Sequence, residues 1–169
     1  MKPGRAIITA GAVLLGSVVS NAPGSPPALA SEQQFGSFQS LLGWWSGRGW
    51  LGFKDGKREQ VKCRATYRWD SGGARLLQAV RCATASGKVD IKSEIQETDG
   101  KLTGTWRERT YEFEGDLKGE ITTGGFRVSV SGSDVKANMT VFVKGERQIV
   151  EVQFLDNVLL GLSVVFKKG

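Results

Sequence analysis

Polar and apolar residues alternate along most of this chain, and short turn-forming segments interrupt the alternation at regular intervals. Between Glu59 and Trp69, for example, Val61 and Tyr67 share one face with Trp69, while Lys62 lies on the other. A period of two places successive side chains on opposite faces of a β-strand. The pattern predicts an all-β chain of antiparallel strands joined by tight turns.

The ends of the alternating segments give the expected strands. They span residues 44–53, 59–69, 74–84, 89–97, 102–109, 112–121, 126–131, 135–143, 148–155 and 158–167. The turn near residues 108–111 is poorly signalled, whereas the others contain typical turn residues. About ten antiparallel strands with short connections form either a sandwich or a closed up-and-down barrel. We favour the barrel, because closure removes both exposed sheet edges and a sandwich usually needs longer crossovers.

Residues 1–30 have the features of a secretory signal peptide. Lys2 and Arg5 precede an apolar run over residues 6–19, which is too short to span a bilayer comfortably. Small residues at Ala28 and Ala30 are typical of a cleavage site. We expect cleavage after Ala30 and a location in the periplasm, with an uncleaved membrane anchor as the alternative.

The rest of the chain, residues 31–169, is expected to form a single β-barrel domain preceded by one short N-terminal helix. That helix is predicted over residues 31–42, where Phe35, Phe38 and Leu42 recur at helical spacing. Gly43 is expected to end it.

Cys63 and Cys82 are the two cysteines of the chain. If the turn after Trp69 centres between Gly72 and Gly73, the cysteines face each other directly across the hairpin. Directly opposed Cβ atoms lie about 4.5–5.5 Å apart, a separation compatible with a disulfide. An exported chain reaches an oxidising compartment, and the pair lacks both CxxC spacing and an activating histidine. We therefore expect a structural disulfide rather than a catalytic thiol.

The sequence contains no histidine. This excludes Ser-His-Asp and Cys-His catalysis and removes a common ligand of zinc and haem. The two cysteines are assigned to a disulfide, and no carboxylates have metal-ligand spacing, so we expect no metal. No Walker or dinucleotide motif is present, so we also expect no cofactor. The formal net charge of +6 is spread along the chain, unlike that of a nucleic-acid-binding protein. We expect that the protein is not an enzyme; the enzymatic alternative needs a carboxylate such as Glu108 with a raised pKa.

Residues 41–49, Leu-Leu-Gly-Trp-Trp-Ser-Gly-Arg-Gly, join the helix to the first strand. This segment resembles the first strand of calycin-type barrels: the Gly-x-Trp of lipocalins and, more closely, the Leu-Leu-Gly-x-Trp-x-Gly-x-Gly of nitrobindin and fatty-acid-binding-like barrels. The chain also resembles small exported proteins of Gram-negative α-proteobacteria, and the residues that carry this likeness include Cys63, Tyr67, Cys82 and residues 104–108. The resemblance implies a calycin-like or lipocalin-like barrel plugged at its base by an indole. Nitrobindin-like proteins bind haem through a histidine, so the resemblance does not extend to haem binding.

The expected barrel interior, the face of Val61 and Tyr67, is mostly apolar and includes Leu160, Leu162 and Val164 on the last strand. An apolar chamber with a few polar groups is typical of a lipid-binding site. The expected ligand-binding residues are Trp45, Tyr67, Gln78, Trp106, Glu108 and Gln148. The sequence thus predicts a periplasmic, non-enzymatic binding protein for an apolar or amphipathic small molecule. The alternative is a filled core, which would make the protein a cell-envelope interaction module.

The outer face of the hairpin that carries the cysteines is basic. The predicted register places Arg64 beside Arg81, with Arg68 nearby. Like charges directly opposite each other destabilise a sheet unless something neutralises them. We favour an acid on the next strand, such as Asp90 or Glu94; the alternative is a bound anionic lipid or acidic partner.

Overall fold

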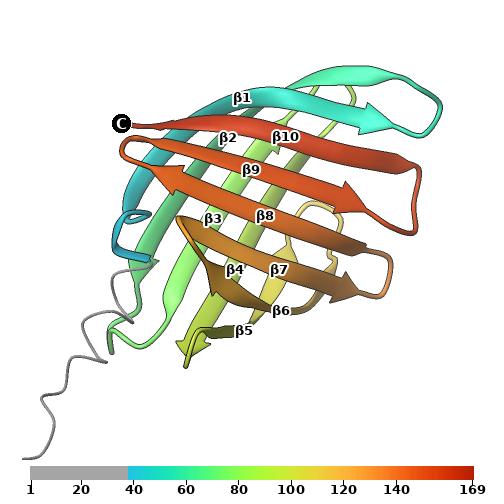
Figure 1. Ribbon diagram of the computed structural model, residues 1–169. Helices are drawn as coiled ribbons and strands as arrows, with labels where there is room; N and C mark the ends of the chain where they lie inside the picture. Colours follow the sequence, from blue (N-terminus) through green and yellow to red (C-terminus); the bar gives the residue numbers. More distant parts are fainter. Residues whose placement is uncertain (1–37) are drawn as a thin grey trace, which may run out of the picture.

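Ten antiparallel strands close into a barrel in the computed structural model, which describes residues 38–169 (Figure 1). The strands are β1 (Gly43–Phe53), β2 (Arg58–Trp69), β3 (Leu76–Ala83), β4 (Lys88–Thr98), β5 (Lys101–Glu108), β6 (Glu114–Thr122), β7 (Gly125–Gly132), β8 (Lys136–Lys144), β9 (Arg147–Phe154) and β10 (Leu159–Lys168). Each strand pairs with its neighbours in the chain, and β1 pairs with β10 to close the sheet. The barrel formed by the described residues therefore has no open sheet edge.

The all-β, up-and-down barrel predicted from the alternation is confirmed, and the strand bounds agree closely with those expected. The signal peptide expected over residues 1–30 and most of the helix expected over residues 31–42 lie outside the described residues. Just before β1, Phe38 and Gln39 form a short helical turn. Within residues 38–169, no helix has the length and apolar character needed to cross a membrane.

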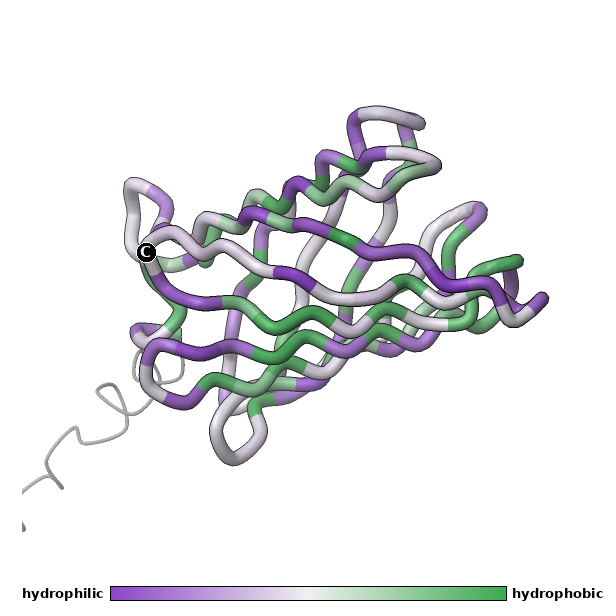
Figure 2. Tube along the Cα trace, turned by 90° about the horizontal axis from the view of Figure 1, so that it is seen from above, coloured by the Kyte–Doolittle hydropathy of each residue, from purple (hydrophilic) through white to green (hydrophobic). Residues whose placement is uncertain are grey.

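Hydrophobic and hydrophilic residues alternate along the strands (Figure 2). On β2, Val61, Ala65 and Tyr67 are buried inside the barrel, whereas Lys62 and Arg64 between them are exposed. This is the two-faced pattern of an antiparallel sheet with one face on a core.

Leu160 corrects one expectation about the interior. It was expected to face inward, but it is 57% exposed. The pairing of β1 with β10 shifts between Gly52 and Phe53, which oppose Gly161 and Leu159. Leu160 is the extra residue of this bulge, and a bulge locally breaks the alternation of inward and outward side chains.

One end of the barrel, which we call the closed end, is filled by aromatic and aliphatic side chains. Phe38 and Leu41, just before β1, are 1% and 0% exposed. Phe38 makes edge-to-face contacts with Trp69 and Phe126, at ring-centroid distances of 6.1 and 5.9 Å. Trp45 at the start of β1 is fully buried and donates its indole N–H to the Leu41 carbonyl at 2.6 Å. An indole thus plugs the base of the barrel, as the resemblance to calycin-type barrels implies.

Glycines on the inner face of β1 allow it to lie close to β10. A Cβ atom at Gly49 would overlap the carbonyl group of Ser163, and one at Gly47 would overlap the ring of Phe166. Larger residues here would push β1 away from β10. The glycines that follow Trp45 therefore help to close the barrel.

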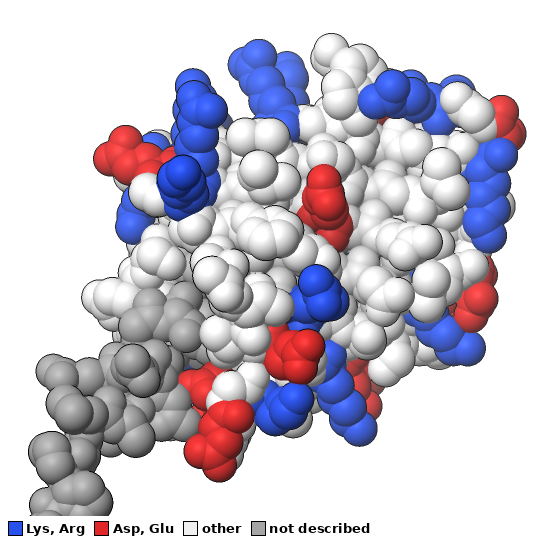
Figure 3. All heavy atoms as spheres, viewed as in Figure 1, with Lys and Arg blue, Asp and Glu red and all other residues white. Residues whose placement is uncertain are grey.

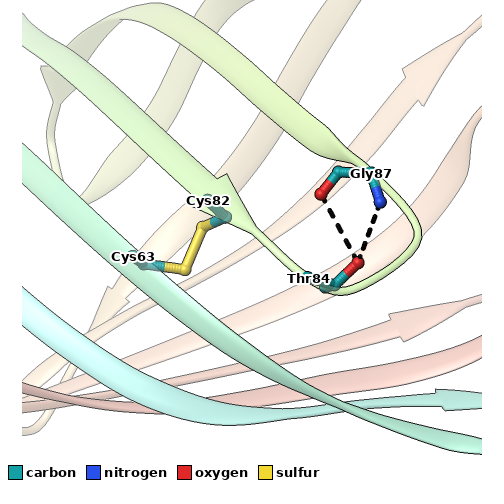
Figure 4. Close-up of a disulfide and its surroundings, with 4 residues drawn as sticks. All are labelled: Cys63, Cys82, Thr84 and Gly87. Carbon is teal, nitrogen blue, oxygen red and sulfur yellow. Dashed lines mark hydrogen bonds between the residues drawn. A yellow bond between two sulfur atoms is a disulfide. The ribbon is translucent and has the colours of Figure 1, made fainter.

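Cys63 on β2 and Cys82 on β3 form the expected disulfide (Figure 4). The two residues are directly opposed, so the predicted register of this hairpin is confirmed. Just beyond Cys82, the hydroxyl of Thr84 accepts a hydrogen bond from the Gly87 N–H at 3.2 Å and orders the turn into β4. The bridge spans a sequence separation of 19, for which the chain-entropy model gives a stabilisation of about 3 kcal/mol.

Candidate functional site

The inside of the barrel has two parts that differ in solvent exposure. At the closed end, the inward side chains of Leu76, Ile95, Leu102, Phe126 and Val141 are at most 1% exposed. Toward the opposite end, which we call the open end, inward apolar side chains remain partly exposed. They are Val80, Ile91, Val130, Met139, Val150, Val152 and Leu162. Because the strand register directs these side chains inward, their exposure means that solvent reaches the interior from the open end.

A polar trio lies in the interior toward the closed end. The hydroxyl of Tyr67 accepts hydrogen bonds from the side-chain amides of Gln148, at 2.7 Å, and Gln78, at 3.2 Å. Tyr67 and Gln148 are 2% and 0% exposed, whereas Gln78 is only partly buried. Burial raises the pKa of Tyr67, and the hydrogen bonds from both glutamines act in the opposite direction. The structure thus brings together three of the expected ligand-binding residues, and Gln78 is the one that solvent reaches.

The two expected tryptophans occupy opposite ends of the interior. Trp45 belongs to the plug at the closed end and is 0% exposed. Trp106 lies on β5 toward the open end, is 8% exposed and donates its indole N–H to the Ser131 carbonyl at 3.2 Å. Both indole N–H groups are therefore engaged within the protein, and each ring offers only an apolar surface.

Glu108, at the end of β5, is buried, and its carboxylate is hydrogen-bonded to backbone groups of the protein. Its carboxylate accepts hydrogen bonds from the backbone N–H groups of Asp90, at 2.8 Å, Thr110, at 2.9 Å, and Tyr111. Burial would raise the pKa of this carboxyl, but these hydrogen bonds outweigh it and the pKa is lowered. Glu108 therefore holds the β5–β6 turn together and does not have the raised pKa that the enzymatic alternative needs.

The basic residues on the outside behave differently from one another. Arg81 forms an ion pair with Asp90 at 3.1 Å, so an acid on the next strand neutralises it, as we favoured. Glu94 is bound by a different arginine, in the hairpin turn. Arg64 has no carboxylate of the described residues within 4.0 Å, and Arg68 lies opposite Leu77, further along the hairpin.

One contact at the open end was not foreseen from the sequence. Glu59 at the start of β2 accepts hydrogen bonds from the hydroxyl and the backbone N–H of Ser86, at 2.6 and 3.2 Å. Hydrogen bonding by the Ser86 side chain is the main cause that lowers the pKa of Glu59. The contact ties the β3–β4 turn to β2, and only the barrel register brings the two residues together.

No cluster of histidine, cysteine, aspartate or glutamate suited to a metal ion occurs within residues 38–169. No protein-family model matches this sequence, and no curated protein matches it. Among solved structures, the S-type phycobiliprotein lyase CPES from Guillardia theta matches with a TM-score of 0.60. The match covers 82% of this chain and 92% of that chain at 8% sequence identity. At this identity the likeness concerns the fold alone, and with the closed ten-stranded sheet it supports a calycin-like barrel.

This comparison corrects the expectation that the protein is not an enzyme. That expectation rests on the missing histidine and the lack of catalytic motifs. The same fold nevertheless occurs in a chain named as a lyase. A fold carries different functions according to the side chains placed on it, so the barrel architecture is compatible with an enzyme.

Proposed function

We propose that this protein binds an apolar or amphipathic, lipid-like small molecule inside the open end of the barrel, and that it does so in the periplasm. The observation that carries the proposal is the partial exposure of inward apolar side chains such as Val80, Met139 and Val150, next to a sealed closed end. A lined recess with one closed side is the usual form of a small-molecule site. Burial of a hydrocarbon chain there would contribute about 0.8 kcal/mol per CH₂ group.

The polar residues suggest how such a ligand would be oriented. Trp45, Tyr67 and Gln148 are sealed in the closed end, and the carboxylate of Glu108 is occupied by backbone N–H groups. Gln78 uses its amide N–H for Tyr67, and its side-chain carbonyl accepts no hydrogen bond from the described residues. We assign this carbonyl as the acceptor for a hydroxyl or protonated carboxyl group at the inner end of the ligand.

Displacement of a fluorescent fatty acid by amphiphiles of increasing chain length tests the proposal. Affinity should rise with chain length until the recess is full. Val80→Trp places an indole in the recess and should abolish binding with moderate loss of stability. Val141→Trp is the matched variant: Val141 is 1% exposed, so the indole should overpack the core and cost about 1–3 kcal/mol of stability.

One combination of results would contradict the ligand-binding proposal. If no amphiphile binds the wild type above micellar background and both variants are strongly destabilised, the interior is filled throughout. The interaction-module alternative would then replace the ligand-binding proposal. Native mass spectrometry of protein isolated from the periplasm adds an independent readout, because it reports a co-purified ligand, and recovery of the protein in that fraction tests the location.

A further inference from the structure

Two adjacent rows of exposed side chains cross the outer face of β8, β9 and β10. The first, the apolar row, consists of Phe142, Ile149 and Val165, which pair across the strands and are 45%, 41% and 46% exposed. The second, the basic row, consists of Lys144, Arg147 and Lys167, which pair in the same way. On each strand the basic residue lies two positions from its apolar counterpart, on the side of the closed end. An apolar band thus lies directly beside a cationic band. In Figure 3 one group of basic side chains lies on this face near the C-terminus, and other basic side chains lie along its remaining edges.

A groove on the outer face continues both rows across β1, β2, β3 and β4. It has a volume of about 1020 Å³, and Val165 and Lys167 form one of its sides. The rest of its lining is strongly basic and includes Arg48, Lys62, Arg64, Arg81 and Lys88. In the register, Val165 of the apolar row pairs with Arg48, and Arg48 pairs with Lys62. The groove and the two rows therefore form one continuous surface.

Few of these positive charges are neutralised within the protein. Asp90 is the one carboxylate among the described residues that line the groove, and Arg81 and Arg109 already bind it, at 3.1 and 3.7 Å. Glu146, in the β8–β9 turn, lies beside the basic row, and Glu151 follows on the far side of the apolar row. Arg48, Lys62, Arg64, Lys88, Lys144, Arg147 and Lys167 have no carboxylate of residues 38–169 within 4.0 Å. The surface carries a net positive charge that an anionic partner would complement.

We propose that this face docks on a bilayer that contains anionic phospholipids. The apolar row would enter the interface between headgroups and acyl chains, and the basic row and the groove would contact lipid phosphates. The positive charges of the basic row and the groove would also suit a nucleic acid or an acidic polymer. Such a partner, however, would leave the apolar row exposed to water. The combination of both rows is what favours the membrane surface.

Flotation with vesicles tests the proposal. The protein should bind vesicles of phosphatidylcholine mixed with phosphatidylglycerol and should bind pure phosphatidylcholine much more weakly. Each basic residue near such a surface contributes about a fivefold factor, so Arg147→Gln combined with Lys167→Gln should weaken binding roughly 30-fold. Lys101→Gln combined with Lys118→Gln removes the same charge from β5 and β6, away from this surface, and should have little effect.

The apolar row has its own variant. Phe142→Ser combined with Ile149→Ser should weaken vesicle binding, and the loss should persist at high salt, where the electrostatic part is screened. All of the substituted side chains are exposed, and thermal melts will verify that each variant folds. The proposal is overturned if the wild type does not bind the anionic vesicles or if the two charge variants behave alike. It is also overturned if the serine variant binds normally while heparin competes, which would indicate a polyanion site.

This docking proposal is separate from ligand binding inside the barrel. The Val80→Trp variant, which should lose the internal ligand, should still float with anionic vesicles. Failure of one proposal is therefore distinguishable from failure of the other.

Discussion

Gln148 on β9 donates its side-chain amide to the hydroxyl of Tyr67 on β2 at 2.7 Å, although the two residues are 81 positions apart in the sequence. Both are sealed from solvent in the closed half of the barrel. The side-chain carbonyl of Gln148 has no hydrogen-bond partner among the described residues. This contact links strands on opposite sides of β1 and β10, and one of its two polar side chains is only half satisfied.

The half-satisfied glutamine predicts unequal effects of removing the two partners. Tyr67→Phe leaves the buried amide of Gln148 without a partner and should reduce the free energy of unfolding by roughly 1–3 kcal/mol. Gln148→Leu removes an amide whose carbonyl is already unpaired, and Gln78 still donates to Tyr67, so the loss should be smaller. Urea denaturation of the two variants checks this order.

The double variant Tyr67→Phe/Gln148→Leu is the control for this pair. Because both polar partners are then replaced, it should be more stable than Tyr67→Phe alone. Equal losses in the two single variants, with strict additivity in the double variant, would contradict the hydrogen bond as the source of the effect.

The pKa of Tyr67 predicts a dependence of stability on alkaline pH. Burial raises this pKa in the folded protein, whereas an unfolded tyrosine ionises near its ordinary value of about 10. Above that pH the unfolded state therefore binds fewer protons than the folded state, and the free energy of unfolding falls as pH rises. Denaturation at several pH values should show a steeper fall for the wild type than for Tyr67→Phe. Parallel curves would mean that Tyr67 does not contribute.

The strand pattern, the hairpin register and the disulfide could all be predicted from the sequence, because each depends on local alternation and local turn residues. The division of the interior into a closed and an open half could not be predicted from the sequence. The seal at the closed end depends on the way Phe38, Leu41 and Trp45 pack together inside the complete barrel. The turn between β5 and β6 was also poorly signalled, and β6 begins at Glu114, two residues later than expected. There the buried side chain of Glu108 organises the turn instead of a glycine or an asparagine, and no composition rule signals this.

The disulfide predicts a measurable loss of stability when it is removed. Cys63→Ala combined with Cys82→Ala should lower the free energy of unfolding by about 3 kcal/mol, because the unfolded chain regains the freedom of the enclosed loop. Chemical denaturation under non-reducing conditions measures this loss. Reduction of the wild type should produce a similar decrease, and a reduced wild type as stable as the oxidised form would show that the bridge does not stabilise the fold.

Glu108 predicts a localised response to acid. Its pKa is lowered in the folded protein because backbone N–H donors outweigh the effect of burial, so its contribution to stability is present above the ordinary glutamate pKa of about 4.3. That contribution is lost as pH falls through the lower folded pKa, since the unfolded state then takes up more protons. Glu108→Gln should cost about 1–3 kcal/mol at neutral pH, because one amide oxygen cannot serve all of these donors.

Hydrogen exchange provides the local readout for this last variant. The amides of Thr110 and Tyr111, which donate to Glu108, should exchange faster in Glu108→Gln, while amides in the centre of β7 should change little. Glu112→Gln is the matched control, because Glu112 lies in the same turn and is exposed. If the two variants exchange alike, the β5–β6 turn does not depend on the buried carboxylate. A faster turn in Glu108→Gln alone, with acid sensitivity reduced relative to the wild type, would establish Glu108 as the group that holds this rim of the open end in place.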